Sequence, residues 1–234
     1  NSFQRRDIFR VFTGITDDQT GDLNRPLENQ MASLFFRWAF HGAGVEVYGE
    51  LVKEDFNRGL RHIIEEPDDF MGRVFGFQKV WSQSEGRLAV LRGEVVNALV
   101  HHSERFDRLR EIGGAPLPLY FHSGIGNTQL GQILGSPTAY GGAGWTIGLD
   151  MYHALGRWSI DLSRSLQTEF SAVYYGTSGP EIADVIYALK LEGVRLIDGT
   201  EWGVALTPSI NLNRNLLRQN DIFNLSLSLS MRGV

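Results

Sequence analysis

Strict alternation of apolar and polar residues recurs along most of the chain. In 202–212, Trp202, Val204 and Leu206 share one parity, and small or polar residues occupy the other. In 222–232, leucines alternate with asparagine and serines in the same way. A period of two places each set on one face of a β-strand, whereas a helix would spread it around its axis.

The alternating runs are long for strands. They run about 9–13 residues in many cases, whereas the usual strand has about five to six residues. A tilted strand that spans a membrane needs about 9–11 residues. The pattern predicts ten strands, near 6–15, 29–40, 45–53, 71–81, 87–99, 142–153, 157–166, 184–196, 201–212 and 221–232.

Short and long connections alternate between these strands. Each short turn contains glycine, at 41–44, 82–86, 154–156 and 197–199. The longer connections are 16–28, 54–70, 100–141, 166–183 and 213–220. Outer-membrane barrels have short periplasmic turns and longer extracellular loops. We therefore predict an all-β fold, an antiparallel up-and-down transmembrane β-barrel in the bacterial outer membrane, with 1–234 as a single domain.

All the tryptophans fall within or at the ends of predicted strands, as an aromatic girdle at the membrane interface requires. They are Trp38, Trp81, Trp145, Trp158 and Trp202. The alternative is that they fill the core of a soluble protein. Charged residues opposite many of them favour the membrane interpretation.

Two predicted strands break the pattern. In 71–81, Arg73 and Lys79 share a parity with phenylalanines, and in 87–99, Arg87 shares a parity with alanine and leucine. We expect a β-bulge to disturb the register there.

Charged residues of the polar parity are expected to face the barrel lumen and to form cross-strand ion pairs. They are Arg37, Glu46, Glu50, Arg92, Glu94, Asp150, Asp161, Lys190 and Glu192. Such residues suit either a filled interior or a pore whose selectivity they tune.

The composition excludes several other classes. The chain has 22 Lys and Arg against 27 Asp and Glu, so it lacks the basic balance of a nucleic-acid binder. Without cysteine it has no disulfide, no thiolate zinc site and no cysteine nucleophile. No apolar run is long enough for a transmembrane helix. Because Asn1 opens the chain and no signal peptide follows, we expect a mature form or part of a longer protein.

Several stretches carry a family resemblance. They are 29–38 (NQMASLFFRW), 44–50 (GVEVYGE), 60–68 (LRHIIEEPD), 74–80 (VFGFQKV), 88–97 (LAVLRGEVVN), 128–135 (TQLGQILG) and 211–214. In this order they resemble the outer-membrane capsule-assembly family (Wzi-type). The resemblance implies an eighteen-stranded barrel that acts as a lectin, and not as an enzyme, and that retains capsular polysaccharide at the cell surface.

This chain departs from the family in three respects. It has about ten predicted strands, so it would be a C-terminal fragment of the larger barrel. The His-Arg pair of the family block THRGQxLG is Gln129-Leu130 here, which affects polysaccharide specificity. The chain ends in Val234 without a terminal aromatic residue.

A lectin site needs aromatic faces to cover sugar C–H groups, and amides and guanidinium groups to bond hydroxyls and carboxylates. The 100–141 loop and the 54–70 loop supply such groups. The candidate polysaccharide-binding residues are Arg105, Arg108, Tyr120, His122, Gln129, Gln132, Tyr140 and Arg61. The alternative for the longer loop is a plug inside the lumen, and Arg61 could instead solvate a short helical turn.

No metal-ligand spacing, catalytic elbow or phosphate loop occurs, so we expect no cofactor, no metal and no catalytic residue. The expected partners are capsular or exopolysaccharide and outer-membrane lipid, without nucleic acid, for a monomeric barrel. One alternative is a porin-like outer-membrane channel. Another is an outer-membrane hydrolase that uses Asp68, Asp69 and His122.

Overall fold

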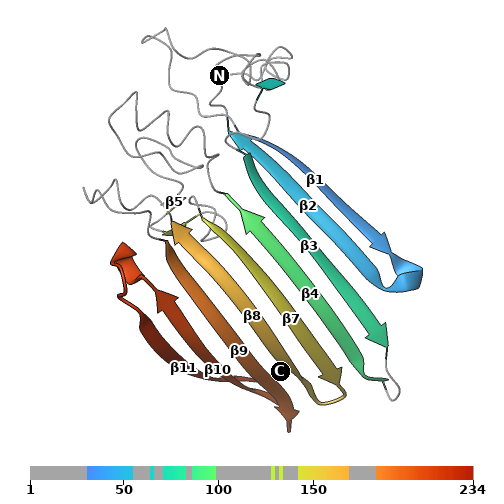
Figure 1. The fold of residues 1–234 in the computed structure, drawn as a ribbon. Helices are drawn as coiled ribbons and strands as arrows, with labels where there is room; N and C mark the ends of the chain where they lie inside the picture. The colour runs from blue at the N-terminus through green and yellow to red at the C-terminus, as the bar shows by residue number, and fades with distance from the viewer. Residues whose placement is uncertain are drawn as a thin grey trace.

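The described residues form a main antiparallel sheet of nine strands, each hydrogen-bonded to the next strand of the sheet along the chain (Figure 1). The computed structural model describes residues 31–54, 64–65, 71–82, 86–98, 128–129, 132–133, 142–168 and 183–233. The strands are β1 (Met31–Phe40), β2 (Val45–Glu54), β3 (Met71–Ser82), β4 (Leu88–Asn97), β7 (Ala143–His153), β8 (Gly156–Thr168), β9 (Asp184–Ile197), β10 (Thr200–Leu212) and β11 (Ile222–Gly233).

Small elements complete the described part of the chain. They are the 3-10 turns η1 (His41–Ala43) and η4 (Arg214–Leu216) and the short strands β5 (Thr128–Gln129) and β6 (Gln132–Ile133), which pair with each other. No helix among the described residues is long and apolar enough to cross a membrane.

Nine of the ten predicted strands are confirmed, as an all-β, up-and-down antiparallel arrangement. The tenth, predicted at 6–15, lies outside the described residues. The strands of the main sheet are 10 to 14 residues long. The short turns all lie at one end of the strands, which we call the turn side. We call the opposite end of the strands the loop side.

A two-residue turn joins β9 and β10. Asp198 and Gly199 both have positive φ angles, 48° and 72°. Two consecutive positive φ angles define the two-residue turn whose twist matches that of antiparallel strands, and an Asp-Gly pair adopts it readily. Local sequence therefore determines the register of this hairpin.

The register gives the sheet two chemically different faces, the apolar face and the polar face. Large apolar side chains of the apolar face are exposed on every strand of the main sheet except β2, up to 76% for Leu229. They include Leu34, Phe36 and Trp38 of β1, Phe75 and Phe77 of β3, Ile147 of β7, Ile160 and Leu162 of β8, Val204 and Leu206 of β10, and Leu225 and Leu227 of β11. Among the described residues only four apolar side chains are buried, so the sheet covers no conventional core there.

The expected bulge in β3 and β4 is wrong. Both strands pair with their neighbours without interruption, and the one register shift among the described pairs lies at Leu166 and Thr168. The cations instead occupy the ends of the apolar stripe: Arg73 lies toward the loop side of β3, and Lys79 lies toward its turn side. Lys79 donates to the carbonyl of Ala43 and lies 5.7 Å from the centroid of the Trp81 ring. A long cationic side chain near the end of a strand can thus share a face with apolar residues without a bulge, because its charged group reaches the polar surroundings beyond the strand end.

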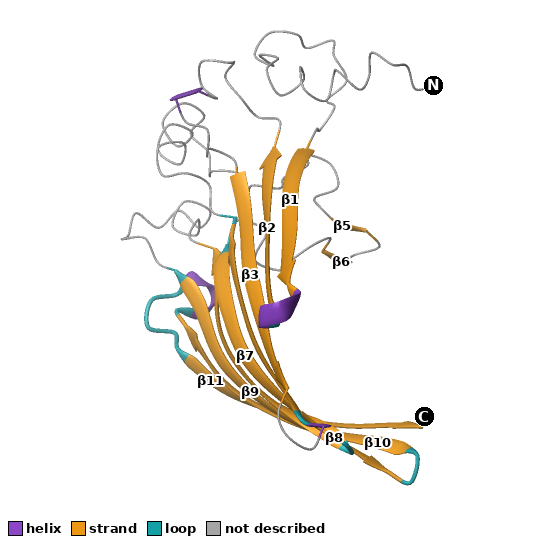
Figure 2. Cartoon of the chain, turned by 90° about the vertical axis from the view of Figure 1, so that its right-hand side faces the viewer, coloured by secondary structure: helices purple, strands orange, loops and turns teal. Residues whose placement is uncertain are grey.

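The turns are staggered along the sheet. The row of paired residues through Phe40, at the first turn, runs on through Lys79, Leu149 and Leu191. Beyond these three residues, β3 continues for three residues, β7 for four and β9 for six. Each successive turn therefore lies farther beyond this row than the one before it. The sheet is also strongly curved (Figure 2).

Glycines within strands lie beneath neighbouring aromatic rings. The ring of Tyr48 covers Gly76, its register partner, so closely that a Cβ atom there would overlap the ring. On the apolar face, Phe36 and Phe75 cover Gly49 in the same way. Strand glycines often mark such close approaches.

We predict that Gly76→Val lowers the free energy of unfolding by about 1–3 kcal/mol, because the added side chain must displace the Tyr48 ring. Gly193→Val is the matched control, since the nearest atom to a Cβ there is Val204 Cγ1 at 3.8 Å. Urea unfolding followed by tryptophan fluorescence measures both changes. Equal losses for the two variants would contradict the assigned packing.

Candidate functional site

The polar face carries a cluster of ion pairs across β4, β7 and β8. Arg92 Nε lies 2.9 Å from Asp150 Oδ2, and Arg92 Nη2 lies 2.5 Å from Asp161 Oδ1. Asp150 is only 5% exposed. One guanidinium thus serves two carboxylates, and its fork geometry suits that task.

A second cluster lies beside the first, on β8 and β9. Glu192 accepts from Arg157 at 2.5 Å, and its other carboxylate oxygen accepts from Lys190. Together the two clusters contain Arg92, Arg157, Lys190, Asp150, Asp161 and Glu192, which we call the charge belt. Three cations and three anions balance in it, so the belt has no net charge when all six groups are ionised.

Two long polar side chains cross an intervening strand at a glycine. Tyr48, Gly76 and Glu94 form one row of register partners, and the Tyr48 hydroxyl donates to Glu94 at 2.7 Å over Gly76. Arg92 reaches Asp161 across β7 at Gly148, where a Cβ atom would overlap the Asp161 carboxylate. Glycine at the middle position therefore permits both contacts.

The polar face of β10 and β11 is uncharged over most of its length. Its side chains are short hydroxyls and amides, which we call the hydroxyl wall. They are Thr207, Ser209, Asn211, Asn224, Ser226, Ser228 and Ser230. This part of the face offers many donors and acceptors and little bulk.

Two buried acceptors lie at the loop-side end of the wall. Asp184 Oδ1 and Asn211 Oδ1 are buried and have no hydrogen-bond partner. Beside them, two hydrogen bonds join the connection between β10 and β11 to the start of β9. The Asn215 N–H donates to Asp184 Oδ2, and the Asn213 side-chain amide donates to the carbonyl of Ala183. A buried acceptor without a donor costs free energy, so a water molecule bound there would stabilise this end of the sheet.

Most predicted polysaccharide-binding residues lie outside the described residues, namely Arg61, Arg105, Arg108, Tyr120, His122 and Tyr140. Asp68 and Asp69 of the hydrolase alternative do so too. Gln129 and Gln132 are backbone partners in the β5–β6 ladder. The described residues contain no group of three or more His, Asp or Glu that could hold a metal ion.

The predicted cross-strand ion pairs are confirmed for Arg92 with Asp150 and Asp161, and for Arg37 with Glu46 at 2.7 Å. Lys190 and Glu192 pair along one strand instead. Sequence reasoning missed Arg157, although its parity, opposite to that of Trp158, places it on the polar face. It also missed Asn211 and Asp184, because only the fold shows that their acceptors are buried.

No protein-family model matches this chain, and no curated protein and no solved structure matches it either. The resemblance to the capsule-assembly family therefore stays a prediction.

We predict that Arg92→Gln lowers the free energy of unfolding by about 1–3 kcal/mol, because buried Asp150 loses its cation. Arg37→Gln serves as the control and should cost less, since the Arg37 side chain is 71% exposed. Urea titrations at equal ionic strength compare the two. Equal losses of stability in the Arg37 and Arg92 variants would contradict the view that burial of Asp150 makes the Arg92 ion pair important for stability.

Proposed function

We propose that this chain is part or all of a transmembrane β-barrel of the bacterial outer membrane that binds capsular or extracellular polysaccharide and helps to retain it at the cell surface. It would act by binding, without a chemical step and without a cofactor, as a monomeric barrel. The observation that carries the proposal is the continuous apolar face of a single-layered sheet.

The apolar face suits a hydrocarbon environment. Monomeric soluble proteins rarely expose contiguous apolar patches of more than a few hundred Å². Here large apolar side chains are exposed from Leu34 in β1 to Leu229 in β11. Strands of 10 to 14 residues are also long enough to cross a bilayer at a tilt.

Closure of the sheet follows from the same environment. Backbone polar groups in hydrocarbon must all be paired within the protein, so a sheet there closes on itself. The stagger of the turns supports closure, because a barrel requires a sheared register and tilted strands. Among the described residues β1 pairs only with β2 and β11 only with β10, so these edges would meet each other or further strands.

The margins of the apolar face support a membrane orientation. On the turn side it is bordered by Trp81, Trp158 and Trp202 together with Lys79 and Arg195. On the loop side, Arg164 lies 5.9 Å from the ring of Tyr187, with its Nε donating to the Tyr187 hydroxyl at 3.2 Å. Aromatic residues and long cations of this kind are enriched where hydrocarbon meets headgroups. The loop side would face the cell exterior.

The hydroxyl wall supports a polyhydroxylated ligand. Sugar hydroxyls exchange hydrogen bonds with exposed amides and hydroxyls such as those of Asn224 and Ser226. Asn224 lies at the loop-side end of the wall, which the proposed orientation exposes to extracellular polysaccharide. The resemblance of the sequence to the capsule-assembly family points to the same class of ligand.

A porin-like channel is the second candidate. The small side chains of the hydroxyl wall favour it, because they leave room on the polar face of β10 and β11. Stepwise conductance in planar bilayers, without saturable polysaccharide binding, would favour the channel over the lectin.

For membrane insertion, we predict that Leu227→Arg on the apolar face lowers the stability in liposomes by about 2–4 kcal/mol, since a cation at mid-bilayer depth is costly. The neighbouring Ser228→Arg places the same cation on the polar face and is the control. Liposome flotation and the folded fraction in urea are measured. Equal behaviour of the two variants, or no flotation of the native protein, would contradict membrane insertion.

For polysaccharide binding, we predict that Asn224→Ala weakens the affinity about two- to tenfold, the worth of one hydrogen bond. Ser230→Ala, near the turn-side end of the same wall, is the control and should bind as the native protein does. Calorimetry with purified capsular polysaccharide from the source cell measures the affinities. Absence of saturable binding by the native protein would overturn the lectin function.

A further inference from the structure

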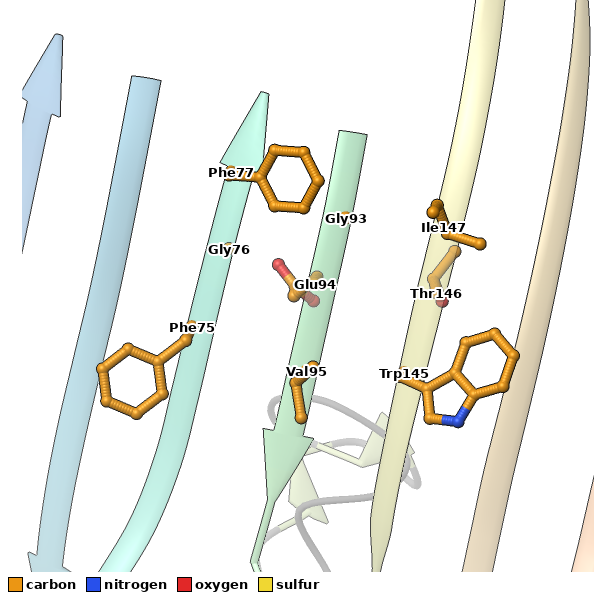
Figure 3. A pocket seen from close by; sticks show the side chains of 9 residues that line it. All are labelled: Phe75, Gly76, Phe77, Gly93, Glu94, Val95, Trp145, Thr146 and Ile147. Atoms are coloured by element: carbon orange, nitrogen blue, oxygen red, sulfur yellow. The ribbon is translucent and has the colours of Figure 1, made fainter. Parts of the chain in front are cut away.

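An apolar groove runs along β4 on the apolar face, with a volume of about 490 Å³ (Figure 3). Its side-chain lining consists of Phe75 and Phe77 from β3, Val95 from β4, and Trp145 and Ile147 from β7, and Gly93 forms part of the floor. The register explains its shape. Two adjacent rows, Phe75–Val95–Trp145 and Phe77–Gly93–Ile147, each place the smallest residue in the middle.

The lining of the groove is almost entirely apolar. Glu94 and Thr146 contribute to the groove, but the register sends their side chains to the polar face, where Glu94 accepts from Tyr48. In Figure 3 both side chains lie on the far side of the sheet from the aromatic rings. The indole N–H of Trp145 is then the one polar side-chain group that the lining holds on the apolar face, so the groove suits an alkyl chain.

The two ends of the groove differ in charge. At the loop-side end Arg73 lies one row beyond Phe75, opposite Asn97, and Arg164 lies opposite Trp145. Guanidinium groups bind phosphate oxygens well. At the turn-side end lies Lys79, whose ammonium group is a point charge without the bidentate fork of a guanidinium. An amphiphile with a phosphate would therefore place its headgroup at the loop side.

We infer that this groove binds one acyl chain of an anionic, phosphorylated membrane lipid, with the headgroup beside Arg73 and Arg164. The inference rests on the membrane insertion proposed above, but not on polysaccharide binding. The groove opens on the face that the proposed barrel turns to the bilayer, so a lipid reaches it without crossing the protein.

The test is native mass spectrometry of the detergent-folded protein titrated with phosphatidylglycerol or phosphatidylcholine. Val95→Phe fills the groove between Phe75 and Trp145 and should weaken binding of the first phosphatidylglycerol about tenfold. Val204→Phe is the matched control and should bind as the native protein does. It makes the same change on the same face, at a similarly exposed site in β10 (48% against 54% for Val95).

A second variant separates the headgroup from the chain. The double variant Arg73→Gln and Arg164→Gln should bind the two lipids equally, whereas the native protein should prefer phosphatidylglycerol about tenfold or more.

These measurements distinguish failure of the lipid site from failure of membrane insertion. Equal lipid binding by the Val95 and Val204 variants, or a preference for phosphatidylglycerol that survives the loss of both arginines, overturns the groove as a lipid site. If the native protein meanwhile floats with liposomes, the proposed membrane insertion stands. A native protein that does not float overturns insertion and the lipid site together. Matching circular dichroism spectra of the variants ensure that folded proteins are compared.

Discussion

Backbone hydrogen bonding between neighbouring strands is the interaction on which the other features of this protein depend. Each strand repeats every two residues, so the continuous sheet from β1 to β11 sorts its side chains onto two faces. A one-residue slip would move Arg92 onto the apolar face and Leu91 onto the polar face. The ion pairs, the aromatic margins and the groove all depend on the observed register.

Glycine within the strands extends what this ladder can do. Where a glycine lies between two register partners, a long side chain crosses an entire strand. Tyr48 meets Glu94 over Gly76, and Arg92 meets Asp161 at Gly148. The same absence of a side chain has a different consequence at Gly93, where it deepens the apolar face into a groove. Small residues thus allow contacts between second-neighbour strands on one face and shape a groove on the other.

The two faces of the sheet relate the proposals to each other. The apolar face, which is exposed among the described residues, supports the proposed lipid environment, and the alternation that produces it also supplies a polar face with a balanced charge belt and a hydroxyl wall. Polysaccharide binding and lipid binding would then use opposite faces. Asn224 and Val95 test them independently, since one residue lies on each face.

The sequence by itself determined the strands, their approximate ends and the parity of each residue, because period-two alternation is a local property. Nine predicted strands and the ion-pairing character of Arg92, Asp150 and Asp161 followed from it. Only the tertiary structure decided which strand residues stand opposite one another. It therefore showed that β3 and β4 need no bulge, that Arg157 joins Glu192, and that Asp184 and Asn211 hold buried acceptors. The physical reason is that register and burial depend on partners far apart along the chain, which no local pattern specifies.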